Sequence, residues 1–198
     1  MKTWLSPVVL EGKLVKLIPM EGFHIPDLLA AAEDGKLWEL WYTSVPSSKT
    51  IKSYVNTVLD EQKAGLAMPF VVLDKKTNTV IGSTRYLNVD AKNRRLEIGA
   101  TWYSQRVQRT GINTECKHLL LTHAFEKLKC IAVEFKTHFH NHTSRNAILR
   151  LGAKQEGIIR NHRIDDQGNL RDTVIFSILD SEWKAVKTGL EFKMSRSY

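Results

Sequence analysis

Two stretches in the first third of the chain repeat their apolar residues at steps of three and four. Residues 25–33 and residues 49–63 both show this spacing, and Pro26 stands at a first-turn position of the earlier stretch. Such spacing puts apolar side chains on one face of a helix. The pattern predicts two amphipathic helices, preceded by one strand over residues 10–19 that ends at Pro19.

Three shorter apolar runs follow at residues 70–73, 80–87 and 95–102, with turn-forming residues between them. Strand-like runs separated by short polar turns are typical of an antiparallel meander. Residues 111–128 then return to helical spacing, which predicts a long helix packed against the sheet.

The last third of the chain alternates between the two patterns. Residues 131–135 are strand-like, and residues 144–151 are helical and closed by Gly152. Two strands are predicted on either side of residues 165–169, the second over residues 173–179, followed by a helix from near Ser181.

This order of elements predicts a mixed α/β fold with one central sheet and flanking helices. Repeats, low-complexity tracts and linkers are missing from the sequence, so we expect a single domain over residues 1–198. With 42% apolar and 25% charged residues, the composition is that of a globular domain.

Composition also predicts the setting of the protein. We expect no membrane insertion, because no run approaches the roughly 20 apolar residues of a membrane span, and residues 1–10 lack an export signal. Cys116 and Cys130 offer neither a disulfide framework nor a CxxC site, so we expect the reducing cytoplasm.

The net charge of +8 favours an anionic partner, and six of those charges belong to residues 100–198. A nucleotide cofactor and a nucleic acid both fit such a surplus. Nucleic acid is the weaker interpretation, because the chain has no basic run of five residues and no recognition motif.

The junction between the third predicted strand of the meander and the helix at 111–128 suits a phosphate. Small and turn-forming residues at 108–114 leave backbone N–H groups of a helix start unpaired, and the helix dipole adds positive charge there. Arg106 and Arg109 add full charges. Neither the dinucleotide motif GxGxxG nor the P-loop motif occurs.

Several segments together make the chain resemble the GNAT superfamily of acyl-CoA-dependent N-acetyltransferases, of the RimJ/RimL type. Gln108 and Gly111 occupy the places of the family's phosphate loop [RQ]-x-x-G-x-[GA], and Asn113 replaces its last small residue, as is familiar in the RimJ/RimL type. The other matching segments are residues 96–102, 141–145, 149–153 and 171–179.

The resemblance implies a GNAT-like fold, with a mostly antiparallel sheet that splays at the cofactor site. It also implies acetyl-CoA as co-substrate, with pantetheine along the backbone of Thr101, Trp102 and Tyr103 and an Asn141 contact to the pantetheine arm. The pyrophosphate would rest on the loop that begins at Gln108 and runs through Arg109, Thr110, Gly111, Ile112, Asn113 and Thr114.

Acetyl transfer to an amine needs a neutral amine, a stabilised oxyanion and a proton for the thiolate. The tyrosine that supplies this proton in much of the superfamily is replaced by Ile148. Ser144, three residues after Asn141, is our candidate acid or thiolate-orienting donor, with a helix N-cap as its alternative role. Glu97 is our candidate base, directly or through water; its alternative role is an ion pair with Arg94, Arg95 or Arg171.

An aromatic group and a histidine group are further candidates for the site. The aromatic residues Trp38, Trp41 and Tyr42 would form a wall of the acceptor pocket by resemblance, or pack in the core. The imidazoles of His138, His140 and His142 suggest a base or a metal site, but no cysteine or carboxylate with ligand spacing accompanies them, so we expect no metal.

The leading hypothesis is an acetyl-CoA-dependent N-acetyltransferase acting on a primary amine, either a protein N-terminal α-amine or a small molecule. The alternative is a non-catalytic acyl-CoA-binding module, motivated by Ile148 and by the altered loop. A homodimer is also possible, since dimers are the commonest assembly.

Overall fold

A computed structural model describes residues 4–165 and 167–196 of the chain. Its main helices are α1 (Ile25–Glu33), α2 (Ile51–Lys63), α3 (Ile112–Thr122), α4 (His142–Arg150) and α5 (Asp180–Arg196). Its strands are β1 (Leu10–Glu11), β2 (Val15–Pro19), β3 (Met68–Asp74), β4 (Thr79–Asp90), β5 (Arg95–Tyr103), β6 (Ala132–His138), β7 (Lys154–Ile164) and β8 (Leu170–Leu179).

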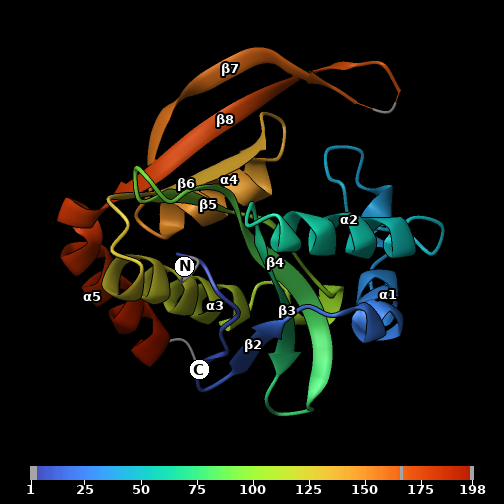
Figure 1. Ribbon diagram of the computed structural model, residues 1–198, viewed down its shortest axis with the longest axis horizontal. Helices are drawn as coiled ribbons and strands as arrows, with labels where there is room; N and C mark the ends of the chain where they lie inside the picture. The colour runs from blue at the N-terminus through green and yellow to red at the C-terminus, as the bar shows by residue number, and fades with distance from the viewer. Residues whose placement is uncertain (1–3, 166, 197–198) are drawn as a thin grey trace.

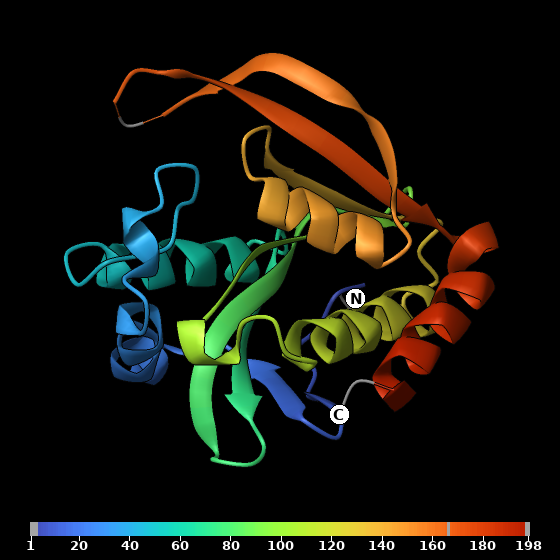
Figure 2. The ribbon, with the colours of Figure 1, turned by 180° about the vertical axis from the view of Figure 1, so that it is seen from behind.

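All eight strands belong to one sheet, in the order β1-β2-β3-β4-β5-β6-β8-β7 (Figure 1). Neighbouring strands are antiparallel except for β5 and β6, which run parallel. The mixed α/β class, the single sheet and its mostly antiparallel order are thereby confirmed. The β7–β8 pair extends beyond the body of the molecule as a long curved ribbon (Figures 1 and 2).

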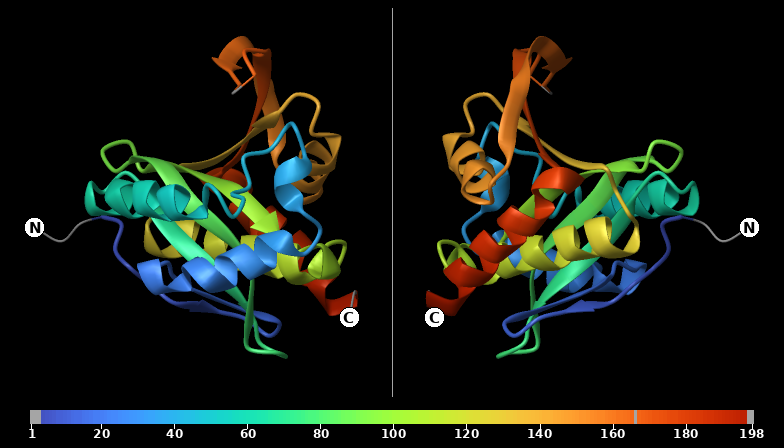
Figure 3. Two further views of the ribbon diagram at one scale, coloured as in Figure 1. Left: turned by 90° about the vertical axis from the view of Figure 1, so that its right-hand side faces the viewer. Right: turned by 90° about the vertical axis from the view of Figure 1, so that its left-hand side faces the viewer.

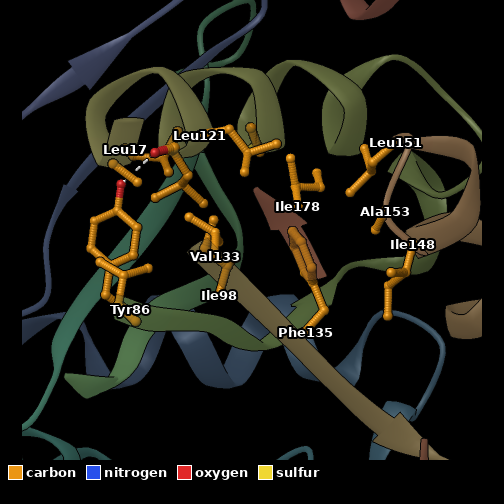
Figure 4. Packing of buried hydrophobic residues seen from close by; sticks show 14 of the residues in the cluster. Leu17, Tyr86, Ile98, Leu121, Val133, Phe135, Ile148, Leu151, Ala153 and Ile178 are labelled. Atoms are coloured by element: carbon orange, nitrogen blue, oxygen red, sulfur yellow. Dashed lines mark hydrogen bonds between the residues drawn. The ribbon is translucent and has the colours of Figure 1, made fainter. Parts of the chain in front are cut away.

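Helices cover both faces of the sheet, as the alternation along β3 shows. Phe70 and Val72 belong to a large cluster with α3, α4 and α5, whereas Val71 belongs to a smaller cluster with α1 and α2. Figure 4 shows sheet residues such as Ile98 and Val133 pointing toward α3 in the large cluster. Two further views show the helices flanking the sheet (Figure 3).

The predicted strand over residues 10–19 is in fact a hairpin of β1 and β2. The carboxylate of Glu115 on α3 accepts hydrogen bonds from the backbone N–H groups of Lys13, Leu14 and Val15, at 2.8, 2.7 and 2.9 Å. A buried carboxylate with three donors stabilises a turn that the local apolar pattern does not reveal. The prediction of one continuous strand was therefore wrong.

The long helix predicted over residues 111–128 changes its winding near the end. After α3 the chain forms a π-helical turn, His123–Lys127. The hydroxyl of buried Tyr86 donates to the carbonyl of Leu120 at 2.7 Å and so occupies an acceptor of the helical hydrogen-bond ladder. Within the described residues, no helix is long and apolar enough to cross a membrane.

Candidate functional site

The sheet opens at the one parallel pairing. β5 and β6 are paired only where residues 95–97 face residues 132–134, although β5 continues to Tyr103 and β6 to His138. Beyond that point the two strands diverge into a wedge. Along residues 98–103 the edge of β5 that faces the wedge has no strand partner in the described chain. Apart from carbonyls that accept from side chains, such as that of Tyr103, its backbone groups are available to an extended ligand.

A β-bulge shapes the wall of this wedge. Between the pairs Arg85–Gly99 and Ser83–Trp102, β5 carries one residue more than β4. Ala100 takes up the extra length with a left-handed φ of 47°, a conformation that alanine adopts at some cost. The bulge places half-buried Thr101 beside the wedge, while Trp102 and Tyr103 are buried.

A buried ammonium lies beneath the bulge. Lys117, on the sheet-facing side of α3 and only 5% exposed, donates through Nζ to Oγ1 of Thr101 at 2.6 Å and of Thr84 at 3.4 Å. No carboxylate of the described residues forms an ion pair with it. Burial lowers the pKa of Lys117 from 10.5 to about 8.

The N-terminus of α3 adjoins the wedge, and its only side-chain acceptor within the described residues is Oγ1 of Thr110, which lies 3.3 Å from the backbone N of Ile112. Gly111 is the N-cap and makes no side-chain cap bond. Before it, Gln108 donates through Nε2 to the Tyr103 carbonyl at 2.9 Å, and the Thr110 hydroxyl donates to the Val107 carbonyl at 2.6 Å. These bonds hold the loop against the end of β5 and leave the first-turn N–H groups of Asn113 and Thr114 for an anion.

Cationic side chains surround this helix start. Arg109 is exposed and has a left-handed φ of 60°. Arg106 forms an ion pair with Asp34, with Nη1 3.0 Å from Oδ2. From the end of α4, Arg150 donates through Nη2 to the hydroxyl of Thr114 at 3.1 Å. A phosphate resting here would find backbone donors and guanidinium groups together.

Asn141 and Ser144 lie at the opposite side of the wedge, at the start of α4. The side-chain Oδ1 of Asn141 accepts a hydrogen bond from the backbone N–H of Ser144 at 3.0 Å, so Asn141 is the N-cap. The alternative role of Ser144 as N-cap is therefore wrong. Its hydroxyl makes no hydrogen bond within the described residues and is available to a ligand.

Glu97 stands where the two strands separate and is 5% exposed. Its Oε2 accepts from Nδ2 of Asn88 at 2.8 Å and lies 3.0 Å from Nζ of Lys136. Burial disfavours the Lys136 ammonium, but Glu97 and Glu134 outweigh that effect and raise the pKa of Lys136.

The ion pair of Glu97 is thus with Lys136 rather than with any of the three arginines that the sequence suggested. Its other oxygen, Oε1, lies over Gly99, where a Cβ atom would approach to 2.9 Å. The same Cβ position would lie 3.0 Å from Cδ2 of Leu87, so this oxygen shares its surroundings with an apolar side chain of β4. Oε2 is therefore paired, whereas Oε1 makes no hydrogen bond or ion pair within the described residues.

The three aromatic residues of the predicted acceptor wall have different surroundings. Trp41 is 60% exposed and its ring contacts the rings of His138 and His140, with centroids 5.0 and 5.7 Å apart. It is not a core residue. Tyr42 packs edge-on against Trp41, whereas Trp38 is half-buried against the smaller cluster. Trp41 joins the loop before α2 to the end of β6.

The three histidines do not share one face. His138 ends β6, His140 lies in the following turn and His142 begins α4. Nδ1 of His138 accepts from the backbone N–H of His140 at 3.1 Å, and burial, with Arg171 and His140 nearby, lowers the pKa of His138. In the described part of the chain no cluster of histidine, cysteine and carboxylate side chains has the form of a metal site.

Two residues of this site were not predicted from the sequence, Lys117 and Arg150. Lys117 interrupts the apolar face formed by Cys116, Leu120 and Leu121, and a charge on a buried stripe is a recognisable signal. Arg150 gave no such signal, since its contact with Thr114 depends on how α4 packs near α3.

The chain is similar to known proteins in sequence and in structure. A family profile described as "Acetyltransferase (GNAT) domain" matches residues 15–154 of the chain. The chain belongs to the GNAT acetyltransferase family. The resemblance inferred from the motifs is thereby confirmed, and with it the expectation that the protein is an acetyltransferase.

Individual GNAT proteins agree with this assignment. The uncharacterized N-acetyltransferase p20 of Bacillus licheniformis is 27% identical over 142 residues, which cover 72% of this chain and 77% of that protein. A crystal structure of a GCN5-related N-acetyltransferase from Brucella melitensis is 29% identical, has a TM-score of 0.87, and is matched over 97% of this chain and 87% of that one.

The GNAT fold also relates the chain to RimL. The RimL ribosomal L7/L12 alpha-N-protein acetyltransferase in complex with coenzyme A is matched with a TM-score of 0.74 at 18% identity, over 87% of this chain and 98% of that one. At this identity the likeness establishes the fold. RimL, whose structure contains coenzyme A, thus has the same GNAT-like fold as this chain.

Proposed function

We propose that the protein is an acetyl-CoA-dependent N-acetyltransferase that acts on a primary amine, either a protein N-terminal α-amine or a small-molecule amine. The observation that carries the proposal is the continuity between the wedge and the start of α3, where the N–H groups of Asn113 and Thr114 have no partner within the described residues. An unpaired strand edge and a helix N-terminus, joined by the bond from Gln108 to Tyr103, suit a ligand with an amide-containing arm and a pyrophosphate.

Coenzyme A has these two parts. Thr101, Trp102 and Tyr103 would pair with its pantetheine arm through their backbone, and the loop from Gln108 to Thr114 would hold its phosphates. Asn141, at the other side of the wedge, would contact the arm through its side-chain amide. Bound acetyl-CoA would supply the thioester from which the acetyl group is taken.

The reaction then follows by direct attack in a ternary complex. The amine nitrogen forms a bond to the acetyl carbon, the carbon–sulfur bond breaks, the amine loses one proton and the thiolate gains one. Glu97 is the proposed acceptor of the amine proton, directly or through water, because its Oε1 has no hydrogen-bond or ion-pair partner within the described residues. Ser144 is the proposed donor to the thiolate.

Backbone N–H groups along the wedge would stabilise the oxyanion of the tetrahedral intermediate. The acceptor would enter from the face that carries Glu97 and Trp41. That face is opposite to α3, so the two substrates would not compete for one entrance.

The test is release of coenzyme A thiol from acetyl-CoA against a panel of small amines and peptides with free N-termini. Calorimetric binding of coenzyme A is measured in parallel. Turnover with any member supports the proposal. Tight binding with no thiol release across the panel would favour the non-catalytic acyl-CoA-binding module, and no binding would contradict both.

A further inference from the structure

A polar groove lies beside the proposed reaction centre, between α2 and the loop that precedes it. Its volume is about 520 Å³, and most of its lining consists of hydroxyl-bearing residues of that loop and of α2. Trp38 and Tyr54 form its aromatic walls, and Arg85 of β4 reaches it from the sheet. None of these residues belongs to the cofactor loop.

Arg85 has one half of its guanidinium engaged. Nη1 donates to Oε2 of Glu61 at 3.0 Å, and the guanidinium carbon lies 5.8 Å from the centroid of the Tyr54 ring. Nε is buried and has no acceptor in the described chain, and no hydrogen bond involves Nη2. The planar edge formed by Nε and Nη2 is the edge that binds a carboxylate through two parallel hydrogen bonds.

The position of Arg85 connects the groove to the proposed chemistry. Arg85 is paired with Gly99 across β4 and β5, and side chains of paired residues share one face of the sheet. Glu97, two residues from Gly99, lies on that face, with Oε1 over Gly99. A group held by Arg85 would therefore be one strand away from an amine held at Glu97.

We propose that Arg85 is a specificity-determining residue that binds a carboxylate carried close to the acceptor amine. The inference rests on the proposed function and names its acceptor class: an α-amino acid, or a peptide whose first residue is acidic. Both present a carboxylate within a few bonds of the amine. A group of this size fits the groove, and the surrounding hydroxyls would bind the remaining polar atoms.

The experiment measures binding without turnover, by calorimetry on the full chain saturated with coenzyme A. One arm compares phenylalanine with phenethylamine and serine with ethanolamine. The other compares the peptide amides Asp-Ala-Ala and Asn-Ala-Ala. We expect the carboxylate-bearing member of at least one arm to bind 10-fold or more tightly, and the responding arm identifies the source of the carboxylate.

Variants decide whether Arg85 is responsible. Arg85→Met should abolish the preference, and Arg85→Lys should restore only part of it, because lysine cannot form two parallel hydrogen bonds. Glu61→Gln should retain the preference. The double variant Arg85→Met with Glu61→Gln removes the carboxylate that the single variant leaves unpaired, and Arg94→Met, at the β4–β5 turn, is the matched control.

Absence of any carboxylate preference in the unaltered protein, or a preference that survives Arg85→Met, would overturn the inference. Thiol release is a separate readout. Turnover of amines with no carboxylate preference would leave the transferase standing without this specificity. An Arg85-dependent preference without turnover on any amine would leave the specificity standing without the transferase.

Discussion

Nζ of Lys117 lies 2.6 Å from Oγ1 of Thr101, which places a buried ammonium directly beneath the bulge at the wedge. Hydroxyl groups are its hydrogen-bond partners, and they compensate the loss of water only in part. The contact ties the second turn of α3 to the strand along which the proposed pantetheine arm would lie. Burial of the ammonium is unfavourable, and this is why the pKa of Lys117 is lowered.

Lys117→Met should therefore stabilise the protein in a pH-dependent manner. The unfolded chain binds the lysine proton near pH 10.5 and the folded chain only near pH 8, so the unaltered protein loses stability relative to the variant as the pH falls between these values. The difference between the two pKa values corresponds to about 3 kcal/mol in the free energy of unfolding, and this difference between the two proteins stays constant below pH 8. Urea unfolding of both proteins from pH 7 to 10 measures it. A pH-independent difference would show that Lys117 titrates normally.

Gly12→Ala should destabilise the hairpin at the start of the sheet. A Cβ atom at this position would lie 2.5 Å from Cδ of Glu115, so the carboxylate must move and its hydrogen bonds to the turn must weaken. We expect a loss of about 2–3 kcal/mol in denaturant unfolding.

Gly157→Ala provides the matched control, because no heavy atom lies within 4 Å of its Cβ position. It should change the free energy of unfolding by less than about 1 kcal/mol. Equal effects of the two substitutions would contradict the role of Glu115 in the hairpin.

Asn141 has a capping role that Asn141→Asp should separate from its proposed contact with the cofactor. Aspartate keeps the acceptor for the Ser144 N–H and suits a helix N-terminus, whereas Asn141→Ala loses the cap at about 1 kcal/mol. Both variants lack the amide N–H₂. We expect thermal stability near that of the unaltered protein for Asp alone, and a raised KM for acetyl-CoA in both. Full recovery of KM by Asp would limit Asn141 to capping.

Ser144→Ala keeps the backbone N–H that Asn141 uses and removes only the hydroxyl. If that hydroxyl donates to the departing thiolate, kcat should fall about 10–100-fold with little change in KM or thermal stability. Thr143→Ala, which removes an exposed hydroxyl of the same helix turn, is the control. Unchanged turnover in Ser144→Ala would remove this residue from the mechanism.

Glu97→Gln should lower kcat/KM by about 100-fold or more and alter the pH–rate profile, if Glu97 accepts the amine proton. Glu134→Gln is a sensitive control, because Glu134 pairs with the same Lys136 at 3.1 Å but belongs to the neighbouring strand. It should leave the profile unchanged. An unaltered profile in Glu97→Gln would reduce Glu97 to a structural partner of Lys136.

Local pattern predicted much of this fold. The helix expected over residues 25–33 is α1 with the same bounds, since helical spacing is a property of the segment itself. Apart from the first strand, which is a hairpin of β1 and β2, the order of strands and helices was also correct. The loop at Gly111 was singled out because a helix start after a strand has unpaired N–H groups wherever it occurs.

Contacts between residues far apart in the sequence could not be predicted from local pattern. Glu115 is read as an ordinary helix residue in the sequence, yet it fixes a turn about a hundred residues earlier. The partner of Glu97 was expected among three arginines and is Lys136, because the short parallel pairing of β5 with β6 sets which side chains meet.

The sequence by itself determined the elements, their order and the GNAT motifs, because each depends on residues that are neighbours along the chain. Only the tertiary structure decided that Lys117 lies beneath Thr101, that Arg85 lines a groove with its Nε unpaired within the described residues, and that Asn141 rather than Ser144 is the N-cap of α4. The physical reason is that strand register, the divergence of β5 from β6 and the packing of α3 on the sheet bring together groups far apart in sequence. Their charges and hydroxyl groups acquire a partner, or lack one, only after that packing is complete.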